Sequence, residues 1–413
     1  MNLIAASREG ASIYPPPVSL IGVAGLAKMA FACVDMAPLQ QSLIDRILRD
    51  SGDSAALMDL AAIKQLSGGR ADGLRLQAHA LEQNRLYRRP AAANPGETRL
   101  LAFMAPGDFM ANAPLEFLLE GSNVSLDMLY VVPGAPLPEF IPEHDLAIVA
   151  VGESDANRTV LHEIASLVGR WPRPILNLPT RIAQLSRDAA KALLGAATDV
   201  AVPTTARIAR AQLCEVATGQ ATIASALPDG AFPIIARPIF SHAGEGLAKL
   251  DDAESAAAYL RLRPEDEFYV SPFIDYRSAD GLFRKYRIAL IDGRPYASHM
   301  AVSQHWMVHY LNAGMTECVA KRDEEARFMA RFDADFAIRH GAALSAIADR
   351  VGLEYFAIDC GELPDGRLLL FEADVAMIIH AMDPSDLFPY KRPQMRKVFA
   401  AFVAMLRRHA QPT

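Results

Sequence analysis

Cysteine is scarce in this sequence. The four cysteines among 413 residues, Cys33, Cys214, Cys318 and Cys360, are scattered, and they show neither a CxxC pair nor the spacing of a Cys/His metal site. The sequence therefore indicates neither a disulfide framework nor a cysteine-ligated zinc site. A reduced, cytoplasmic protein fits this pattern best.

The sequence also lacks a strong excess of either charge and a long uninterrupted apolar run. The net charge of −7, from 41 basic and 48 acidic residues, argues against broad binding to nucleic acids or anionic membranes. The most apolar N-terminal stretch, residues 18–34, is interrupted by Lys28. We expect a buried helix there rather than a signal peptide or a membrane span. No GxGxxG motif follows a strand-like segment, so the dinucleotide fingerprint is missing.

The apolar residues that are present suffice for several cores. Hydrophobic residues make up 51% of the chain and charged residues 22%, which is typical of a soluble globular protein of two or three domains. Residues 19–89 are predicted to be helical, because AALMDLAAIKQLSGG and ADGLRLQAHALEQNRLY both carry apolar residues at helical spacing. The two segments resemble one tetratricopeptide-type hairpin. A single hairpin cannot bury a solenoid core, so a helical cap is favoured over a separate protein-binding module.

Beyond the linker-like PAAANPGE (90–97), short apolar strands alternate with helices. This alternation predicts a parallel sheet covered by helices. The expected strands are 98–105, 125–132 and 145–151, and the expected helices are 114–121 and 157–169. From residue 186 the pattern becomes a mixture of helices and β-rich segments, which ends in an amphipathic helix at 392–410. The chain is therefore expected to have a helical segment at 1–95, an α/β domain at 98–185 and a larger unit at 186–405.

Two segments carry candidate nucleotide-binding groups. In FPIIARPIFSHAGEG (232–246), a strand delivers Arg237 to a glycine-bearing loop. That loop is either a phosphate cradle or an ordinary hairpin. In EFYVSPFIDY (267–276), Pro272 interrupts an apolar strand. The segment is either a hinge that pairs with a flat base through backbone groups or an edge strand with a bend.

The next segment, FRKYRIALIDGRPY (283–296), is predicted to form a hairpin around its Asp-Gly pair. Because side chains alternate along a strand, Lys285 and Arg287 share one face and Arg284 lies on the other. The shared face either lines an anion-binding cleft or is a solvated basic surface.

A fourth segment, EYFAIDCGELPDGRLLLFEAD (354–374), reads as two strands joined by a turn at LPDGR. Pairing these strands as a hairpin brings Asp359 near Glu372 and Asp374. Three converging carboxylates favour a hard cation with oxygen ligands, above all Mg²⁺ shared with nucleotide phosphates.

These four segments, in this order and spacing, resemble the ATP-grasp superfamily of ligases, which includes glutathione synthetase, enzymes that modify a ribosomal protein, and D-Ala-D-Ala ligase. The resemblance covers residues 186–400. It implies an α+β protein with an ATP-grasp fold, in which a small subdomain (186–270) and a large subdomain (271–405) grip Mg-ATP. Residues 98–185 would form the small α/β domain that precedes such a unit.

The resemblance also assigns roles by position. Arg237 stands where the family has a lysine on the α- and β-phosphates, and Arg187 (or Lys191, one turn on) where it has an earlier phosphate-binding base. Arg287 resembles the arginine that steadies the acyl-phosphate and the tetrahedral intermediate. The other implied residues are Ser241, His242, Gly244 and Gly246 in the mobile phosphate loop, Pro272, Phe273 and Ile274 at the adenine hinge, Asp275 near the ribose, and Asp359, Glu372 and Asp374 as ligands of two Mg²⁺ ions.

Three positions depart from the family pattern. Arginine replaces lysine at Arg237, which keeps the charge but presents a rigid fork. Pro272 replaces the hinge glutamate and keeps only a backbone carbonyl. Asp374 replaces an asparagine and retains an oxygen ligand. None of these changes deletes a charge in the way expected of an inactive enzyme.

The segment HWMVHYLNAGM (305–315) places His305 and His309 four residues apart. This spacing is that of two helical zinc ligands, but the glutamate of HExxH is missing. A loop over the acceptor-substrate pocket, or a structural role, fits better. Lys285, His299, His305 and His309 are the candidate substrate-binding residues.

The resemblance implies an ATP-dependent carboxylate–amine ligase that acts on a small acid, amino acid or peptide. A homodimer is compatible with it, since dimers are common among such ligases. The alternative is a non-catalytic ATP-binding regulatory or scaffold protein that meets a protein partner through its N-terminal helices. Phosphotransfer to a hydroxyl would use the same residues and differ only in where the phosphate ends.

Overall fold

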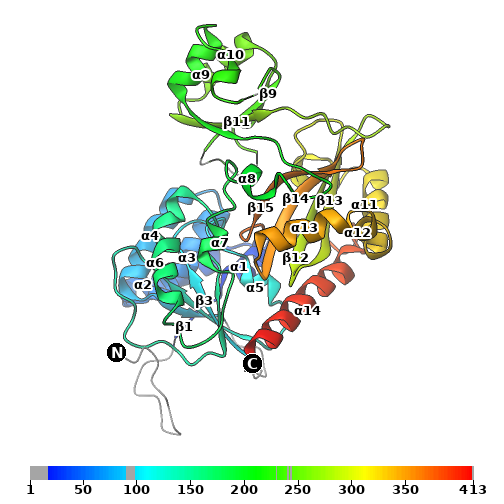
Figure 1. Ribbon diagram of the computed structural model, residues 1–413. Helices are drawn as coiled ribbons and strands as arrows, with labels where there is room; N and C mark the ends of the chain where they lie inside the picture. The colour runs from blue at the N-terminus through cyan, green and yellow to red at the C-terminus, as the bar shows by residue number, and fades with distance from the viewer. Residues whose placement is uncertain (1–16, 90–97, 229, 240, 242–243, 412–413) are drawn as a thin grey trace. The chain divides into compact units, whose positions relative to one another are not determined.

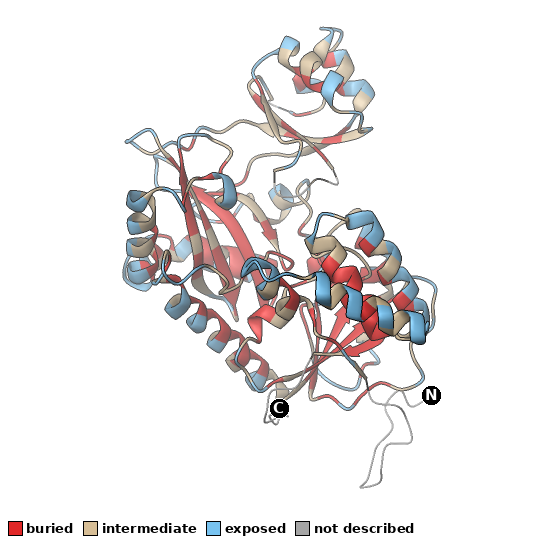
Figure 2. Cartoon of the chain, turned by 180° about the vertical axis from the view of Figure 1, so that it is seen from behind, coloured by how far each residue is buried: buried red, intermediate tan, exposed pale blue. Residues whose placement is uncertain are grey.

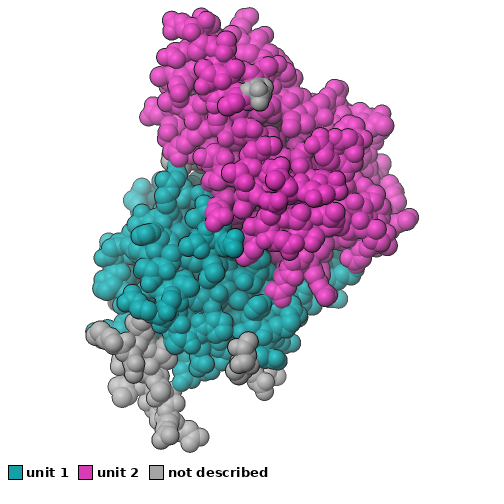
Figure 3. Space-filling view, viewed as in Figure 1, with its two compact units in different colours: residues 1–183, 353–356, 374–413 teal, residues 184–352, 357–373 magenta. Residues whose placement is uncertain are grey.

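The computed structural model describes residues 17–89, 98–228, 230–239, 241 and 244–411. The predicted linker at 90–97 therefore lies outside the described residues. The chain divides into two compact units (Figure 3). Unit 1 comprises residues 1–183, 353–356 and 374–413, and unit 2 comprises residues 184–352 and 357–373.

Unit 1 is built on a six-stranded sheet with the order β1-β2-β4-β3-β5-β6. Its strands are β1 (Val18–Ser19), β2 (Leu86–Arg88), β3 (Arg99–Met104), β4 (Ser125–Tyr130), β5 (Leu146–Val149) and β6 (Ile175–Leu176). Strand β3 pairs in parallel with β4 and β5, and β5 pairs in parallel with β6. Nearly every residue of β3, β4 and β5 is buried, as expected for parallel strands covered on both faces (Figure 2). The predicted parallel sheet is confirmed.

The helices of unit 1 include four between residues 23 and 83, in the region predicted to be helical (Figure 1). They are α1 (Val23–Phe31), α2 (Ala37–Arg49), α3 (Ser54–Leu66), α4 (Arg70–Gln83), α5 (Leu115–Leu118), α6 (Arg158–Val168), α7 (Pro179–Ile182) and the C-terminal α14 (Lys391–Ala410). Helix α3 packs against α4, and α14 packs against α5 and β5. Among the described helices, none is long and apolar enough to cross a membrane.

The helical prediction for residues 19–89 is wrong at its two ends. Helix α4 ends at Gln83, and β2 continues as a strand antiparallel to β4, while β1 pairs with β2. Arg88 in β2 also forms an ion pair with the buried Asp127 of β4, with Nε 2.6 Å from Oδ1. Pairing with a strand about 40 residues away thus overrides the local helical pattern.

The N-terminus of α1 is held by two carboxylates from other helices, the buried Asp59 and the partly buried Glu116, instead of a local cap. The backbone N–H groups of Ile21 and Gly22 donate to Asp59 of α3, at 2.9 and 3.1 Å. Those of Val23 and Ala24 donate to Glu116 of α5, both at 3.1 Å. Burial raises the pKa of both carboxyl groups. These two acids therefore join the N-terminal helices to the sheet domain.

We expect Glu116→Ala to lower the free energy of unfolding by about 2 kcal/mol, because it leaves two partly buried N–H groups at the start of α1 without their acceptor. Glu116→Gln, which keeps one carbonyl oxygen, is expected to lose less. Urea unfolding followed by circular dichroism measures both variants. Asp72→Ala, at an exposed position on α4, is the control and should change stability by less than about 0.5 kcal/mol. An unchanged unfolding midpoint in Glu116→Ala would contradict this role.

Unit 2 contains a four-stranded antiparallel sheet with the order β10-β9-β11-β8. Its strands are β8 (Ala206–Ala209), β9 (Ile234–Pro238), β10 (Ala248–Leu250) and β11 (Glu267–Pro272). Helices α9 (Arg210–Ala217) and α10 (Ala253–Leu262) pack together on one side of it (Figure 1). Their shared core includes Leu213, Ile234, Leu260 and Phe268.

Unit 2 also contains a five-stranded sheet with the order β13-β12-β14-β15-β7. Its strands are β7 (Val200–Ala201), β12 (Phe283–Ile291), β13 (Arg294–Ser303), β14 (Tyr355–Glu362) and β15 (Leu368–Asp374). Helices α8 (Ala190–Leu194), α11 (Val319–Arg331), α12 (Phe336–Arg339) and α13 (Gly341–Val351) complete it, and α11 and α13 pack against β13. Short 3-10 helices in the chain are η1 (Asp155–Asn157), η2 (Ile223–Ser225), η3 (Tyr310–Asn312) and η4 (Phe332–Ala334).

Both predicted hairpins of this sheet are confirmed. Strands β12 and β13 pair antiparallel around Asp292 and Gly293, whose φ angles of 47° and 71° are those of a tight two-residue turn. Strands β14 and β15 are neighbours, joined by the LPDGR turn. The mixture of helices with antiparallel sheets in unit 2 confirms the predicted α+β class.

Candidate functional site

The first feature of the site is a buried carboxylate held by two cations. Asp359 of β14 has no exposed surface. Arg287 of β12 meets it with two hydrogen bonds, Nε to Oδ1 at 2.8 Å and Nη2 to Oδ2 at 2.9 Å, and Lys285 Nζ lies 2.6 Å from Oδ2. Burial acts to raise the pKa of Asp359, but the charges of Arg287 and Lys285 outweigh it and hold that pKa well below its ordinary value. Asp359 is therefore ionised in the folded protein.

The alternation predicted along β12 explains this placement. Lys285 and Arg287 point to one face of the sheet and meet Asp359, whereas Arg284 pairs with Asp280 and Glu324. On the second face, Tyr286 packs against Phe328 of α11 and Phe336 of α12. The face that carries Lys285 and Arg287 is thus the face opposite to these helices.

A second carboxylate, Glu372 of β15, forms an ion pair with Arg187, which precedes α8. Burial acts to raise the pKa of Glu372, and the charge of Arg187 lowers it below the ordinary value, with further contributions from Lys285 and Arg237. Asp359 acts in the opposite direction, which places the two carboxylates within electrostatic range of each other. The predicted residues from four separate segments therefore converge around Glu372.

Arg237 of β9 has no carboxylate partner of its own among the described contacts. Its guanidinium donates to the hydroxyl of Ser241, at 3.1 Å, and to the carbonyl oxygen of the same residue. Burial, together with the nearby charge of Arg187, lowers the pKa of Arg237 to about 10. A partly buried cation whose pKa is lowered lacks compensating negative charge, and an anion bound nearby would supply it.

The predicted phosphate loop is described only in part. Gly244 and Gly246 have φ angles of 80° and 66°, which favour glycine. A Cβ at Gly246 would lie 2.7 Å from Cδ of Pro238. The Gly246 carbonyl accepts a hydrogen bond from Tyr259, at 2.8 Å. His242 lies outside the described residues.

The predicted adenine hinge follows β11. Pro272 is the last residue of that strand, and the N–H of Phe273 donates to the carbonyl of Pro233, at 3.0 Å. The Phe273 ring lies under Nζ of Lys249, which is 4.8 Å from its centroid, and packs edge-on against Trp306. Ile274 follows with a partly buried side chain. Asp275 forms an ion pair with Arg277, and this contact lowers the pKa of the Asp275 carboxyl group.

Two of the three candidate histidines lie at the site. His299 pairs across the sheet with Arg287, and its ring centroid is 4.8 Å from that of Tyr310. Burial, with the charges of Lys285 and Arg287, lowers the pKa of His309. His305 is exposed, and its backbone N–H donates to Ser303. Residues 304–307 form bends and η3 begins only at Tyr310, so His305 and His309 do not share a helical face.

The metal prediction is only partly reflected in the arrangement of side chains. Among the described residues, no three His, Cys, Asp or Glu side chains form a group that could hold a metal ion. Asp359 and Glu372 each face arginine instead, and Asp374, the last residue of β15, accepts a hydrogen bond from the N–H of Ala376 at 3.1 Å. The assignment of these three as magnesium ligands remains a prediction.

The sequence reasoning missed Lys249, whose ammonium sits over the Phe273 ring. The available signal was its place in AKL, the strand that follows the glycine loop and pairs with the strand of Arg237. The reasoning also missed that Arg187 would meet Glu372, because 185 residues separate them and no local pattern links them.

Comparison with known proteins returns similar structures but no similar sequences. No protein-family model matches the chain, and no curated protein matches it. VanG D-Ala:D-Ser ligase from Enterococcus faecalis is 12% identical over 75% of this chain and 100% of its own, with a TM-score of 0.46. The RimK domain protein ATP-grasp from Sphaerobacter thermophilus is 15% identical over 75% and 99%, with a TM-score of 0.40. A D-alanine–D-alanine ligase from Bacillus anthracis, solved with ATP, is 13% identical over 76% and 98%, with a TM-score of 0.44.

At these identities and TM-scores, the case for a function depends on the residues of the site.

Proposed function

We propose that this protein is an ATP-dependent carboxylate–amine ligase of the ATP-grasp type, which acts on a small acid, amino acid or peptide and releases ADP and phosphate. The observation that carries the proposal is the environment of Glu372. Arg187, Arg237, Lys285 and Asp359 all act on its carboxylate, and Arg287 clamps Asp359 behind them. Cations outnumber carboxylates in this cluster, which suits a polyphosphate.

The cluster fits the phosphates of ATP. Arg237 is partly buried and has no carboxylate partner among the described residues, and the charge of Arg187 acts on it, so a bound anion would stabilise both cations. Gly244 and Gly246 provide the open backbone of a phosphate loop, and Pro272 to Asp275 would border the base and the ribose. The role of the loop is to exclude water from the phosphates once they are bound.

The carboxylates fit the cation that accompanies ATP. Asp359, Glu372 and Asp374 supply hard oxygen ligands of the kind that Mg²⁺ prefers. Magnesium would neutralise charge on the transferring phosphoryl group. With magnesium held by Glu372, the guanidinium of Arg187, which pairs with Glu372 here, would be available to a phosphate oxygen.

The remaining residues suit the carboxylate substrate. Arg287 is fixed by two hydrogen bonds to Asp359, so its guanidinium is preorganised to stabilise oxygen charge on an acyl-phosphate and on the tetrahedral intermediate. Lys285, His299 and His309 lie around it and would orient the acid and the amine. The lowered pKa of His309 keeps it neutral near pH 7, so it is able to accept a proton from an attacking amine.

A coupled assay for ADP release, with Mg-ATP and pools of carboxylic acids and amines, tests the proposal. Ligation predicts ADP release that requires both an acid and an amine, with phosphate in solution. Phosphate found on a product hydroxyl would indicate a phosphotransferase. ATP binding by calorimetry without any turnover would indicate the regulatory alternative, and absence of both binding and turnover would refute an ATP site.

Arg237 offers a test that separates binding from stability. We expect Arg237→Met to weaken Mg-ATP binding at least about 10-fold, because a charge-assisted contact to phosphate is lost. The unliganded protein should keep its melting temperature within a few degrees. Among the described residues Arg237 has no carboxylate partner, so its removal leaves no carboxylate unpaired. Arg237→Lys restores the charge and should recover most of the binding. Calorimetry with a non-hydrolysable ATP analogue and thermal unfolding give the two readouts, and equal binding by Arg237→Met would contradict the phosphate role.

A further inference from the structure

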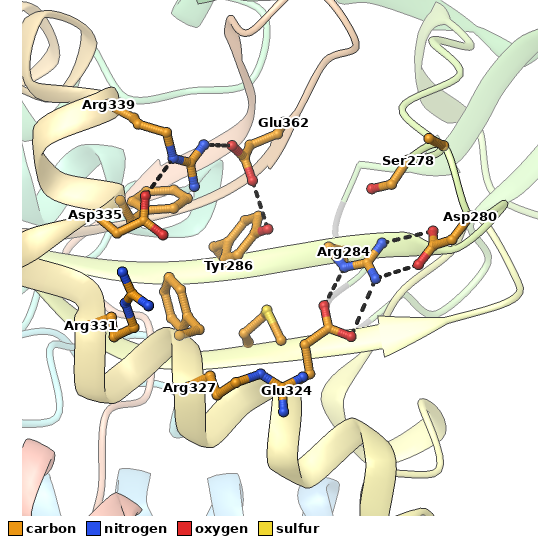
Figure 4. Close-up of a pocket in the computed structure, with 14 residues that line it drawn as sticks. Ser278, Asp280, Arg284, Tyr286, Glu324, Arg327, Arg331, Asp335, Arg339 and Glu362 are labelled. Carbon is orange, nitrogen blue, oxygen red and sulfur yellow. Dashed lines mark hydrogen bonds and ion pairs between the residues drawn. The ribbon is translucent and has the colours of Figure 1, made fainter.

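A second pocket lies on the other face of the five-stranded sheet. Its volume is about 680 Å³, and β12, α11 and α12 line it together with residues 278–280 (Figure 4). Arg284 and Tyr286 of β12 point into it, whereas Lys285 and Arg287 of the same strand point to Asp359 on the opposite face. The strand period thus separates this pocket from the site already described.

The carboxylates that line this pocket are all engaged. Arg284 forms ion pairs with Asp280 and Glu324, and Arg339 forms ion pairs with Asp335 and Glu362. The Glu362 carboxylate also accepts a hydrogen bond from the Tyr286 hydroxyl, at 2.8 Å. It lies 2.8 Å from Nε2 of His340. These contacts lower the pKa of Glu362 to about 2, although burial acts to raise it. Each of the four carboxylates therefore has a partner inside the pocket, and each of the two arginines serves two carboxylates.

Two further arginines in the lining are not engaged. Arg327 and Arg331 extend from α11 into the view of Figure 4, and within the described part of the chain neither side chain has a hydrogen bond or an ion pair. They are four residues apart on one helix, so their side chains lie on the same face about 5–6 Å apart at Cβ. Two guanidinium groups at this spacing are able to donate hydrogen bonds to one doubly negative group from both sides.

The floor between these arginines is aromatic. Tyr286 packs against Phe328 and Phe336, with ring centroids 5.0 and 4.8 Å apart. Tyr286 and Phe336 are almost fully buried, so the floor is rigid, and the hydroxyl of Ser278 stands at the far rim (Figure 4). The pocket therefore combines an anion clamp with a flat apolar surface, as small-molecule sites commonly do.

We propose that this pocket is a second ligand site, distinct from the ATP site, which binds a small phosphate-bearing anion through Arg327 and Arg331. The ligand's remaining body lies on the aromatic floor. Because β12 contributes side chains to both faces, a ligand in the pocket would contact the strand that carries Arg287.

Calorimetric titration of the full chain with inorganic pyrophosphate tests the proposal, with a saturating non-hydrolysable ATP analogue present to fill the other site. One binding event is expected to remain. Its dissociation constant should rise about 10-fold or more in Arg327→Ala, and binding should be lost in Arg327→Ala/Arg331→Ala. The lysine pair Arg327→Lys/Arg331→Lys should retain part of the affinity, because charge remains but the fork is lost.

The control variants separate pyrophosphate binding at this pocket from the proposed ligase activity. Arg261→Ala removes an exposed arginine from α10 and should leave pyrophosphate binding unchanged. Arg237→Met reports on the ATP site and should leave this event unchanged, whether or not the protein is a ligase. Unchanged binding in the double alanine variant, or no binding event in the wild-type protein at millimolar pyrophosphate, would overturn the proposal. Since both arginines are exposed, unchanged melting temperatures are expected to confirm that the variants fold.

Discussion

Arg287→Met is expected to lower ATP-dependent turnover by about 100- to 1000-fold, the loss typical for removal of one preorganised charge-stabilising donor. The structure adds a second expected effect. Asp359 is fully buried and depends on Arg287 for two of its hydrogen bonds, so the substitution leaves a buried carboxylate with Lys285 as its main cation. Breaking a buried ion pair from one side costs about 3–5 kcal/mol. Steady-state ADP release and urea unfolding measure the two effects.

The pH dependence identifies the cause of this instability. In the wild-type protein the pKa of Asp359 is held below its ordinary value, so its contribution to stability is present above that value and is lost as the pH falls. Arg287→Met brings the folded-state pKa closer to that of the unfolded chain. The stability gap between wild type and variant should therefore narrow as the pH falls below about 4. A gap that is constant with pH would contradict the electrostatic explanation.

Arg294→Ala is the matched control, because Arg294 is an exposed arginine on the same β12–β13 hairpin. Its loss should change stability by less than about 0.5 kcal/mol and leave turnover unchanged. Arg287→Lys keeps a cation near Asp359 and should recover much of the stability, but less of the turnover, because the bidentate fork is gone. Full turnover by Arg287→Met would remove Arg287 from the proposed mechanism.

Glu372→Ala is expected to abolish magnesium-dependent ATP turnover, whereas Asp374→Asn should retain much of it. Glu372 is at the centre of the charge cluster, and its removal takes away an oxygen ligand and releases Arg187 from its ion pair. Asp374 instead accepts a hydrogen bond from the N–H of Ala376, a contact that the amide oxygen of asparagine also makes. The local turn at the end of β15 should therefore survive this change.

Turnover measured against magnesium concentration separates the two roles. For Asp374→Asn we expect a higher magnesium requirement with a similar maximal rate, because one charge is removed from the ligand set. For Glu372→Ala no magnesium concentration should restore turnover, and Glu372→Gln should recover little, since an amide is a weaker ligand than a carboxylate. Normal turnover by Glu372→Ala would show that the metal assignment is wrong.

Much of the fold was accessible from local patterns. The apolar runs predicted the buried parallel strands of unit 1, and the Asp-Gly and LPDGR turns predicted both hairpins of the large sheet. Strand β2 was missed, because Leu86 to Arg88 follow helix α4 directly and only their partner, β4, makes them a strand.

By itself, the sequence determined which side chains share a face. The period of a strand placed Lys285 and Arg287 on one face and Arg284 on the other, and the β14–β15 hairpin put Asp359 and Glu372 on neighbouring strands. The tertiary structure alone decided what those side chains meet. It turned both carboxylates toward arginines instead of toward an open metal site, and it placed two unengaged arginines of α11 at a pocket behind the same sheet. The physical reason is that the pairing of charges depends on burial and on segments distant in the chain. The alternation of residues along one strand contains no information on either.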